Sequence, residues 1–185
     1  LGLAEFTLSR KDPQYVGRAK EIQKAEKERM NGGHPCQAVP VLKDVMGEVK
    51  KQYPEADRKN TGFGSTIFAV KPGDGSAREQ AASCQKVLGG WANIANEYAT
   101  KRYRSNLINW GIVPFIAPPQ GLEVGDWVYV PGVREKLIAG ETTFPAKLVR
   151  GEAVTDIMLT LPAISEKERK LLLIGCLINH YAAKE

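Results

Sequence analysis

The strongest constraint on this chain is a buried-strand pattern followed at once by a glycine loop and a helix start. Residues 65–70, Ser-Thr-Ile-Phe-Ala-Val, form a short apolar run with the length and flanks of a buried strand. Residues 71–75, Lys-Pro-Gly-Asp-Gly, follow as a loop, and a helix is expected from Ser76 to about Leu88. This order is typical of an α/β fold, which places ligands at such loops.

Periodic segments elsewhere predict the rest of the architecture. Strands alternate with helices and then dominate, so we expect an α/β domain in which helices pack against layered sheets. We assign residues 61–185 to this domain and residues 1–60 to an N-terminal helical extension or connector, whose first helix has only a thin apolar stripe. The other expected helices are 12–31, 41–53, 100–110 and 165–182, and the other expected strands are 92–96, 112–116, 125–130, 146–149 and 153–161.

Composition places the chain among soluble globular proteins. Hydrophobic residues make up 43% and charged residues 25% of the 185 residues. No segment approaches the roughly 18 uncharged apolar residues of a membrane span, and no basic-then-apolar signal opens the chain. We therefore expect a cytoplasmic protein without a membrane partner. Because the sequence opens on Leu1, we expect it to be a fragment or a processed chain.

The net charge of +5 leaves several partners open. A nucleic acid, an acidic partner domain or an anionic substrate would each suit a basic chain. The charges occur in mixed-sign runs such as residues 20–29, which favours a solvated helix face.

Three scattered cysteines argue against a metal site within this chain. Cys36, Cys84 and Cys176 lie far apart, and no pair has the C-x-x-C spacing that zinc and iron–sulfur sites commonly use. Their odd number also argues against a disulfide framework. Cys84 and Cys176 fall in helical apolar patterns, so we expect both in the core.

The segment from Gly73 to Gln80 carries the candidate chemistry. Its glycines allow a close approach of backbone to ligand, and the following helix start favours an anion such as a carboxylate. Arg78 could grip a carboxylate through two parallel hydrogen bonds. A purely structural interpretation is also open, because Ser76 and Glu79 have the spacing of a capping box. The same spacing recurs at Ser165 and Glu168, to which we assign no chemistry.

Residues 73–82, Gly-Asp-Gly-Ser-Ala-Arg-Glu-Gln-Ala-Ala, resemble a segment of the aconitase superfamily, G-x-G-S-S-R-E followed by His or Gln and A-A. That superfamily includes aconitase, homoaconitase and isopropylmalate isomerase. Further matches follow in order, and the similarity is strongest over about residues 62–116. They are Val87-Leu88-Gly89-Gly90 at a helix end, Ala92-Asn93-Ile94 in the next strand, Asn106-Leu107, and Gly111-Ile112-Val113-Pro114.

The resemblance implies a C-terminal swivel domain of β/β/α architecture that closes over an active site completed by other domains. Those domains, upstream in the same chain or in a large subunit, carry a 4Fe-4S cluster, and the substrate is a small di- or tricarboxylic hydroxy-acid. The resemblance also implies catalytic roles for Ser76, as an alkoxide base, and Arg78, as a charge clamp. Such a domain would belong to a hydro-lyase and would be inactive alone. The implied substrate-binding residues are Gly73, Asp74, Gly75 and Ala77.

One position departs from the family pattern. Ala77 stands where the second serine is expected, which implies a changed hydrogen-bond network or lost activity. The upstream T-T-D-H or N-T-D segment of family swivel domains has no clear counterpart. Because the chain is basic and lacks cluster cysteines, the alternative is a non-catalytic module that binds RNA or protein, for which a basic stripe with exposed aromatic residues is the expected feature. Arg102 and Arg104 could reach an anionic substrate, but a solvated helix face explains them as well.

Overall fold

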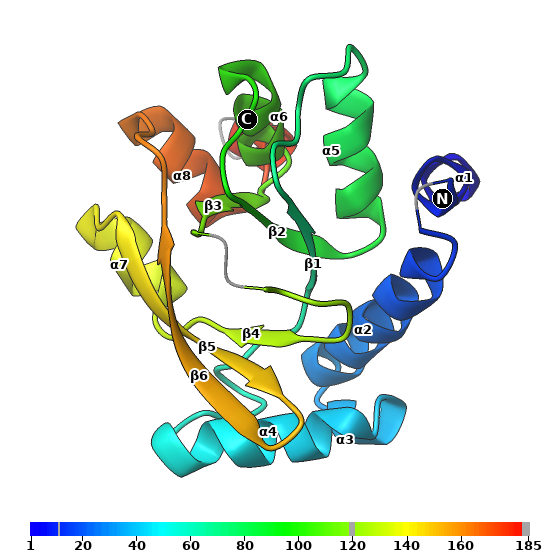
Figure 1. The fold of residues 1–185 in the computed structure, drawn as a ribbon, viewed down its shortest axis with the longest axis vertical. Coiled ribbons are helices and arrows are strands. Elements are labelled where there is room, and N and C mark those ends of the chain that lie inside the picture. Colours follow the sequence, from blue (N-terminus) through cyan, green and yellow to red (C-terminus); the bar gives the residue numbers. More distant parts are fainter. Residues whose placement is uncertain (11, 119–120, 183–185) are drawn as a thin grey trace.

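The computed structural model describes residues 1–10, 12–118 and 121–182 (Figure 1). Four helices come first. They are α1 (Gly2–Ser9), α2 (Tyr15–Met30), α3 (Pro35–Ala38) and α4 (Val41–Gln52). None of the described helices is both long enough and apolar enough to span a bilayer.

Strands and helices then alternate, as the sequence predicts. The first part contains β1 (Ser65–Ala69), α5 (Arg78–Val87), β2 (Gly90–Ala95), α6 (Lys101–Asn109) and β3 (Val113–Ile116). The second part contains β4 (Trp127–Tyr129), α7 (Val133–Ala139), β5 (Thr143–Arg150), β6 (Ala153–Thr160), α8 (Glu166–Ile174) and α9 (Leu177–Ala182).

The six strands form one mixed sheet in the order β1-β2-β3-β6-β5-β4. β1, β2 and β3 are parallel, whereas β4, β5 and β6 are antiparallel. A single pair, Ile116 with Thr160, joins the two sets. The α/β class is therefore confirmed, and the layered strands that the resemblance implies take the form of two sets that diverge from this pair (Figure 1).

The main core lies where the two strand sets meet helices α6, α7 and α8. Phe115 of β3 and Phe144 of β5 are both buried, and their rings meet edge to face with centroids 5.2 Å apart. Ile94, Ile108 and Leu171 complete the contact between the sheet and the helices. Apolar burial of this extent is the main favourable term for folding, at about 25 cal/mol per Å².

The N-terminal helices pack on the rest of the chain more closely than their thin apolar stripe suggests. Ala19 of α2 joins Cys84 of α5 and Leu88, the C-cap residue of α5, in one buried cluster. Glu26 is only 8% exposed; it is bound by the Arg29 guanidinium and accepts a hydrogen bond from the Phe63 backbone N–H at 2.9 Å. A buried carboxylate needs such partners, so they tie α2 to the segment that leads into β1.

The predicted C-terminal helix is divided in the structure. Gly175 adopts a left-handed conformation with φ of 101° and ends α8, and α9 begins at Leu177. Cys176 lies at this break and is half-buried, so its placement in the core was wrong, whereas Cys84 is buried as expected. Helices α1, α3 and α7 were not predicted, because each is short and carries a weak periodic signal.

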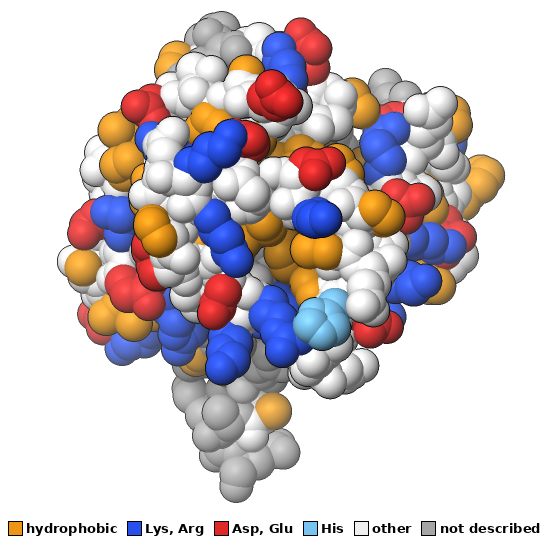
Figure 2. Space-filling model, turned by 90° about the horizontal axis from the view of Figure 1, so that it is seen from below, with side chains coloured by type: hydrophobic (Ala, Val, Ile, Leu, Met, Phe, Trp, Pro, Cys, Tyr) orange, Lys and Arg blue, Asp and Glu red, His pale blue; other side chains and the backbone are white. Residues whose placement is uncertain are grey.

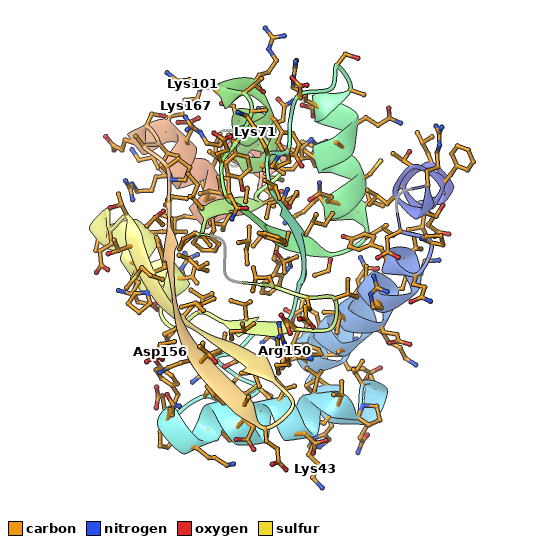
Figure 3. The ribbon with its side chains drawn as sticks, in the orientation of Figure 1. Lys43, Lys71, Lys101, Arg150, Asp156 and Lys167 are labelled. Atoms are coloured by element: carbon orange, nitrogen blue, oxygen red, sulfur yellow. The ribbon has the colours of Figure 1, made fainter. Side chains whose placement is uncertain are left out.

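An ion pair outside the main core gives the fold a testable dependence on pH. The Asp126 side chain is 6% exposed and accepts hydrogen bonds from Arg150 Nε and Nη2, each at 2.7 Å. Arg150 holds the pKa of this carboxyl below its usual value. Figure 3 shows Arg150 on the antiparallel strands. The pair therefore joins β5 to the loop that precedes β4.

We expect Asp126→Asn to lower the free energy of unfolding by about 1–2 kcal/mol at neutral pH, because it removes a charge-assisted pair. The folded-state pKa lies below the unfolded value of about 3.9, so this stabilisation is complete above that value and is lost as pH falls through the folded pKa. Urea unfolding of both proteins over a pH series measures the difference. A difference that stays constant into acid would contradict the expectation.

Candidate functional site

The candidate segment lies, as predicted, between the end of β1 and the start of α5. Gly73 has φ of +100°, which glycine adopts without strain. A Cβ at this position would lie 2.6 Å from Cβ of Tyr103 on α6, so the backbone is seated directly against that residue. The loop therefore follows a path that requires glycine at position 73.

Ser76 is not a helix cap. The helix begins at Arg78, its N-cap residue is Ala77, and no side chain caps it. The capping interpretation of Ser76 and Glu79 is therefore wrong, whereas Ser165 and Glu168 form the predicted capping box. Ser76 is exposed and makes no hydrogen bond with the described residues. Its hydroxyl is thus free of the structural role that competes with chemistry.

Glu79 binds α6 instead of reaching back to Ser76. Its Oε1 accepts a hydrogen bond from Trp110 Nε1 at 2.5 Å. The Asn106 amide, with its nitrogen facing Glu79, donates to Oε2 at 3.2 Å and accepts from the Glu79 backbone N–H at 3.1 Å. Sequence reasoning missed this contact because Trp110 follows Glu79 by 31 residues.

Arg78 is half-buried and is fixed at one atom. Its Nε donates to the Gly73 carbonyl at 3.0 Å. The same carbonyl accepts a hydrogen bond from Thr100 Oγ1 at 3.1 Å. Arg78 forms no ion pair within the described residues, so the rest of its guanidinium is available to an anion.

The other predicted binding residues, Asp74, Gly75 and Ala77, are exposed in the same loop. A negative carboxylate at Asp74 does not attract an anionic substrate, so its backbone N–H is the group suited to that role. Lys71 is paired with Glu97 at 2.7 Å, and its pKa is raised chiefly by this bond. Figure 3 shows Lys71, Lys101 and Lys167 toward the same end of the molecule, which favours an anionic ligand there.

A buried polar group that sequence reasoning missed lies beneath the loop. The Tyr103 hydroxyl accepts hydrogen bonds from Gln85 Nε2 and Asn93 Nδ2, each at 2.9 Å. These three side chains are at most 4% exposed. Burial raises the pKa of Tyr103, so the phenol stays neutral at physiological pH. This group fixes the ring on which Gly73 rests.

The flanking arginines of α6 differ in their surroundings. Arg102 is exposed, as expected for a solvated helix face. Arg104 is half-buried, and its Nε has no hydrogen-bond partner within the described residues. Its positive charge lowers the pKa of Glu168 on α8, a smaller effect than the hydrogen bonds that Glu168 accepts. These contacts place Arg104 at the packing of α6 on α8.

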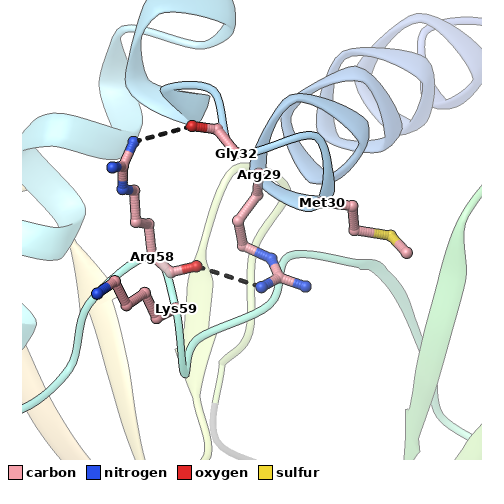
Figure 4. Close-up of a pocket in the computed structure, with 5 residues that line it drawn as sticks. All are labelled: Arg29, Met30, Gly32, Arg58 and Lys59. Atoms are coloured by element: carbon pink, nitrogen blue, oxygen red, sulfur yellow. Dashed lines mark hydrogen bonds between the residues drawn. The ribbon is translucent and has the colours of Figure 1, made fainter.

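One surface pocket, of about 450 Å³, is lined by residues that precede β1 in the chain, whereas the candidate loop follows β1. Arg29, Met30, Gly32, Arg58 and Lys59 line it. The two guanidinium groups point in different directions, and each binds a backbone carbonyl (Figure 4). Figure 2 shows other Lys and Arg side chains gathered along a rim of the molecule among Asp and Glu. The binding-module hypothesis requires a basic stripe together with exposed aromatic residues. None of the five residues that line this pocket is aromatic.

Comparison with known proteins identifies the segment that carries the loop. Residues 36–120 match the family model described as the aconitase C-terminal domain. This segment is similar to aconitase C-terminal domains. The match spans the parallel strands, α5, α6 and the whole Gly73–Arg78 loop, and it confirms the resemblance drawn from the sequence motifs.

Solved structures are also similar to the chain. One of them is 3-isopropylmalate dehydratase from Methanocaldococcus jannaschii, which is 26% identical, with 70% of each chain covered and a TM-score of 0.47. No curated protein matched the chain.

Proposed function

We propose that this chain is the swivel domain or small subunit of an aconitase-like hydro-lyase. Such an enzyme would dehydrate and rehydrate a di- or tricarboxylic hydroxy-acid. The observation that carries the proposal is the free Ser76 hydroxyl, two residues from a partly unpaired Arg78, in a loop of the segment that is similar to aconitase C-terminal domains. A serine that served only to begin α5 would be expected to cap it.

The two side chains have complementary roles in this proposal. Ser76 Oγ, as an alkoxide, removes a proton from the carbon next to a substrate carboxylate. Arg78 binds that carboxylate and stabilises the negative charge that develops on it. The nearby helix start and Arg78 both favour a negatively charged oxygen at Ser76, which lowers the cost of forming the alkoxide.

The iron–sulfur cluster that the resemblance implies does not fit the described part of this chain. No group of three His, Cys, Asp or Glu side chains there could hold a metal ion. Cys36, Cys84 and Cys176 are separate free thiols on α3, on α5 and after α8. We therefore propose that the cluster-bearing domains are a partner, and we derive no step of the reaction from this chain through the cluster.

The test is to isolate the native protein or complex that carries this sequence and to assay it with a panel of hydroxy-acids. We expect hydration and dehydration of at least one di- or tricarboxylic acid, together with iron–sulfur absorbance. The chain of residues 1–185, assayed alone, should give neither signal. Adding the partner back to the chain should restore turnover, which separates a missing subunit from a damaged one.

A native assembly that holds no iron–sulfur cluster and turns over no hydroxy-acid would contradict the hydro-lyase assignment. Retention of RNA that weakens as salt rises would then favour the binding module, since phosphate contacts are salt-sensitive.

A further inference from the structure

We call residues 73–79 the Ser76 turn. The start of α6 contacts this turn at Gly73, and the end of α6 contacts it at Glu79. We infer that α6 is the positioning element of this turn and that Thr100, its N-cap residue, is a positioning residue for Arg78. This inference rests on the proposed function, because it concerns how the same loop is held for catalysis. No sequence motif singled out Thr100, and its role follows only from the contacts in the fold.

The first contact is a shared acceptor. Thr100 Oγ1 accepts a hydrogen bond from the Tyr103 backbone N–H at 3.3 Å and so caps α6. The same hydroxyl donates its single proton to the Gly73 carbonyl at 3.1 Å. That carbonyl also accepts from Arg78 Nε at 3.0 Å, so Thr100 and Arg78 share one acceptor, and a carbonyl oxygen can accept two hydrogen bonds. The start of α6 therefore fixes the atom that orients Arg78.

The second contact lies at the other end of α6. Trp110, its C-cap residue, donates to Glu79, the residue that directly follows Arg78. Arg78 is thus held from before through Gly73 and from after through Glu79. Between these points, Ser76 and Ala77 are exposed. The arrangement leaves the proposed base unbonded while its flanks are fixed.

The Tyr103 ring, against which Gly73 packs, also constrains the turn. Gly73 rests on Tyr103, so a Cβ at position 73 would lie 2.8 Å from Cγ and Cδ1 of the ring. Because Gln85 and Asn93 hold the Tyr103 hydroxyl, the ring cannot move aside without breaking buried hydrogen bonds. Preorganisation of this kind acts on the chemical step, since the geometry is set before substrate binds.

The test uses the complete enzyme with three variants. Thr100→Val removes the hydroxyl but keeps the shape, and Thr100→Ser keeps the hydroxyl. Ser165→Ala is the matched control, because it removes another side-chain helix cap, on α8, whose hydrogen bonds run to Glu168 and to none of the described residues of the loop. Both Thr100→Val and Ser165→Ala should lower stability by a similar amount, typical of a lost cap.

We expect Thr100→Val to lower kcat about 10-fold or more with little change in KM, because misorientation affects the transition state more than binding. Thr100→Ser should restore kcat, and Ser165→Ala should leave it unchanged. Hydrogen exchange of the complete enzyme should show faster exchange at residues 73–78 in Thr100→Val only. A kcat equal to that of Ser165→Ala, or unchanged exchange in the loop, would overturn the inference. Full turnover in Ser76→Ala would instead refute the proposed function, and the exchange measurement would still report on Thr100.

Discussion

Ser76→Ala in the complete enzyme is expected to lower kcat at least about 10³-fold, because it removes the proposed base and leaves no other hydroxyl in the turn. Ala77 occupies the next position, so a neighbouring serine cannot replace it. Since Ser76 is exposed and bonds no described residue, the free energy of unfolding should change by less than about 0.5 kcal/mol. Steady-state kinetics and iron–sulfur absorbance are the two measurements.

Ser83→Ala is the control for this experiment. Ser83 lies on α5, the helix that follows the turn, and its Oγ donates to the Gln80 carbonyl at 3.1 Å, so its replacement changes a serine outside the turn. Turnover should remain within about twofold of the unsubstituted enzyme, as expected for a residue without contact to substrate. If Ser76→Ala retained the same turnover as Ser83→Ala, Ser76 would not be the base.

Gly111→Ala is expected to destabilise the fold by roughly 3 kcal/mol or more. Gly111 has φ of +68°, and an added Cβ would lie 1.6 Å from the Gly175 carbonyl oxygen. That oxygen belongs to backbone, so a side-chain rotation cannot relieve the clash. The turn after α6 and the turn after α8 would have to separate, which would disturb the contact between these helices.

The matched control is Gly47→Ala in α4. Nothing lies within 4 Å of its added Cβ, and its conformation is helical. The free energy of unfolding of this variant should rise by about 0.5–1 kcal/mol, because alanine is a better helix former than glycine. Urea unfolding followed by circular dichroism compares both variants with the parent chain. A Gly111→Ala midpoint near that of the parent would show that the two turns can separate at little cost.

The local parts of the fold could be predicted from sequence because their signals are local. The strand at residues 65–70, the loop and the helix after it were placed within two residues of their observed bounds. Apolar runs indicate where the strand and helix lie, and the glycines between them indicate where each element ends. The position of the candidate site in the chain followed from the same pattern.

The contacts that organise the site could not be predicted from local pattern. The spacing of Ser76 and Glu79 indicates a capping box, yet the Glu79 carboxylate accepts a hydrogen bond from the Trp110 side chain instead. The division at Gly175 follows from its left-handed turn against Gly111, which is distant in sequence. In both cases a tertiary contact overrides a local preference.

The single strand pair between Ile116 and Thr160 has a consequence for how this architecture can diversify. The two strand sets contribute side chains to one hydrophobic core, but a single residue pair joins their backbones. Side chains can repack after substitution, whereas a one-residue slip in a ladder reverses every side chain of a strand. The antiparallel ribbon can therefore accept insertions and new sequences as a separate module, while the parallel strands that present Ser76 and Arg78 keep their register.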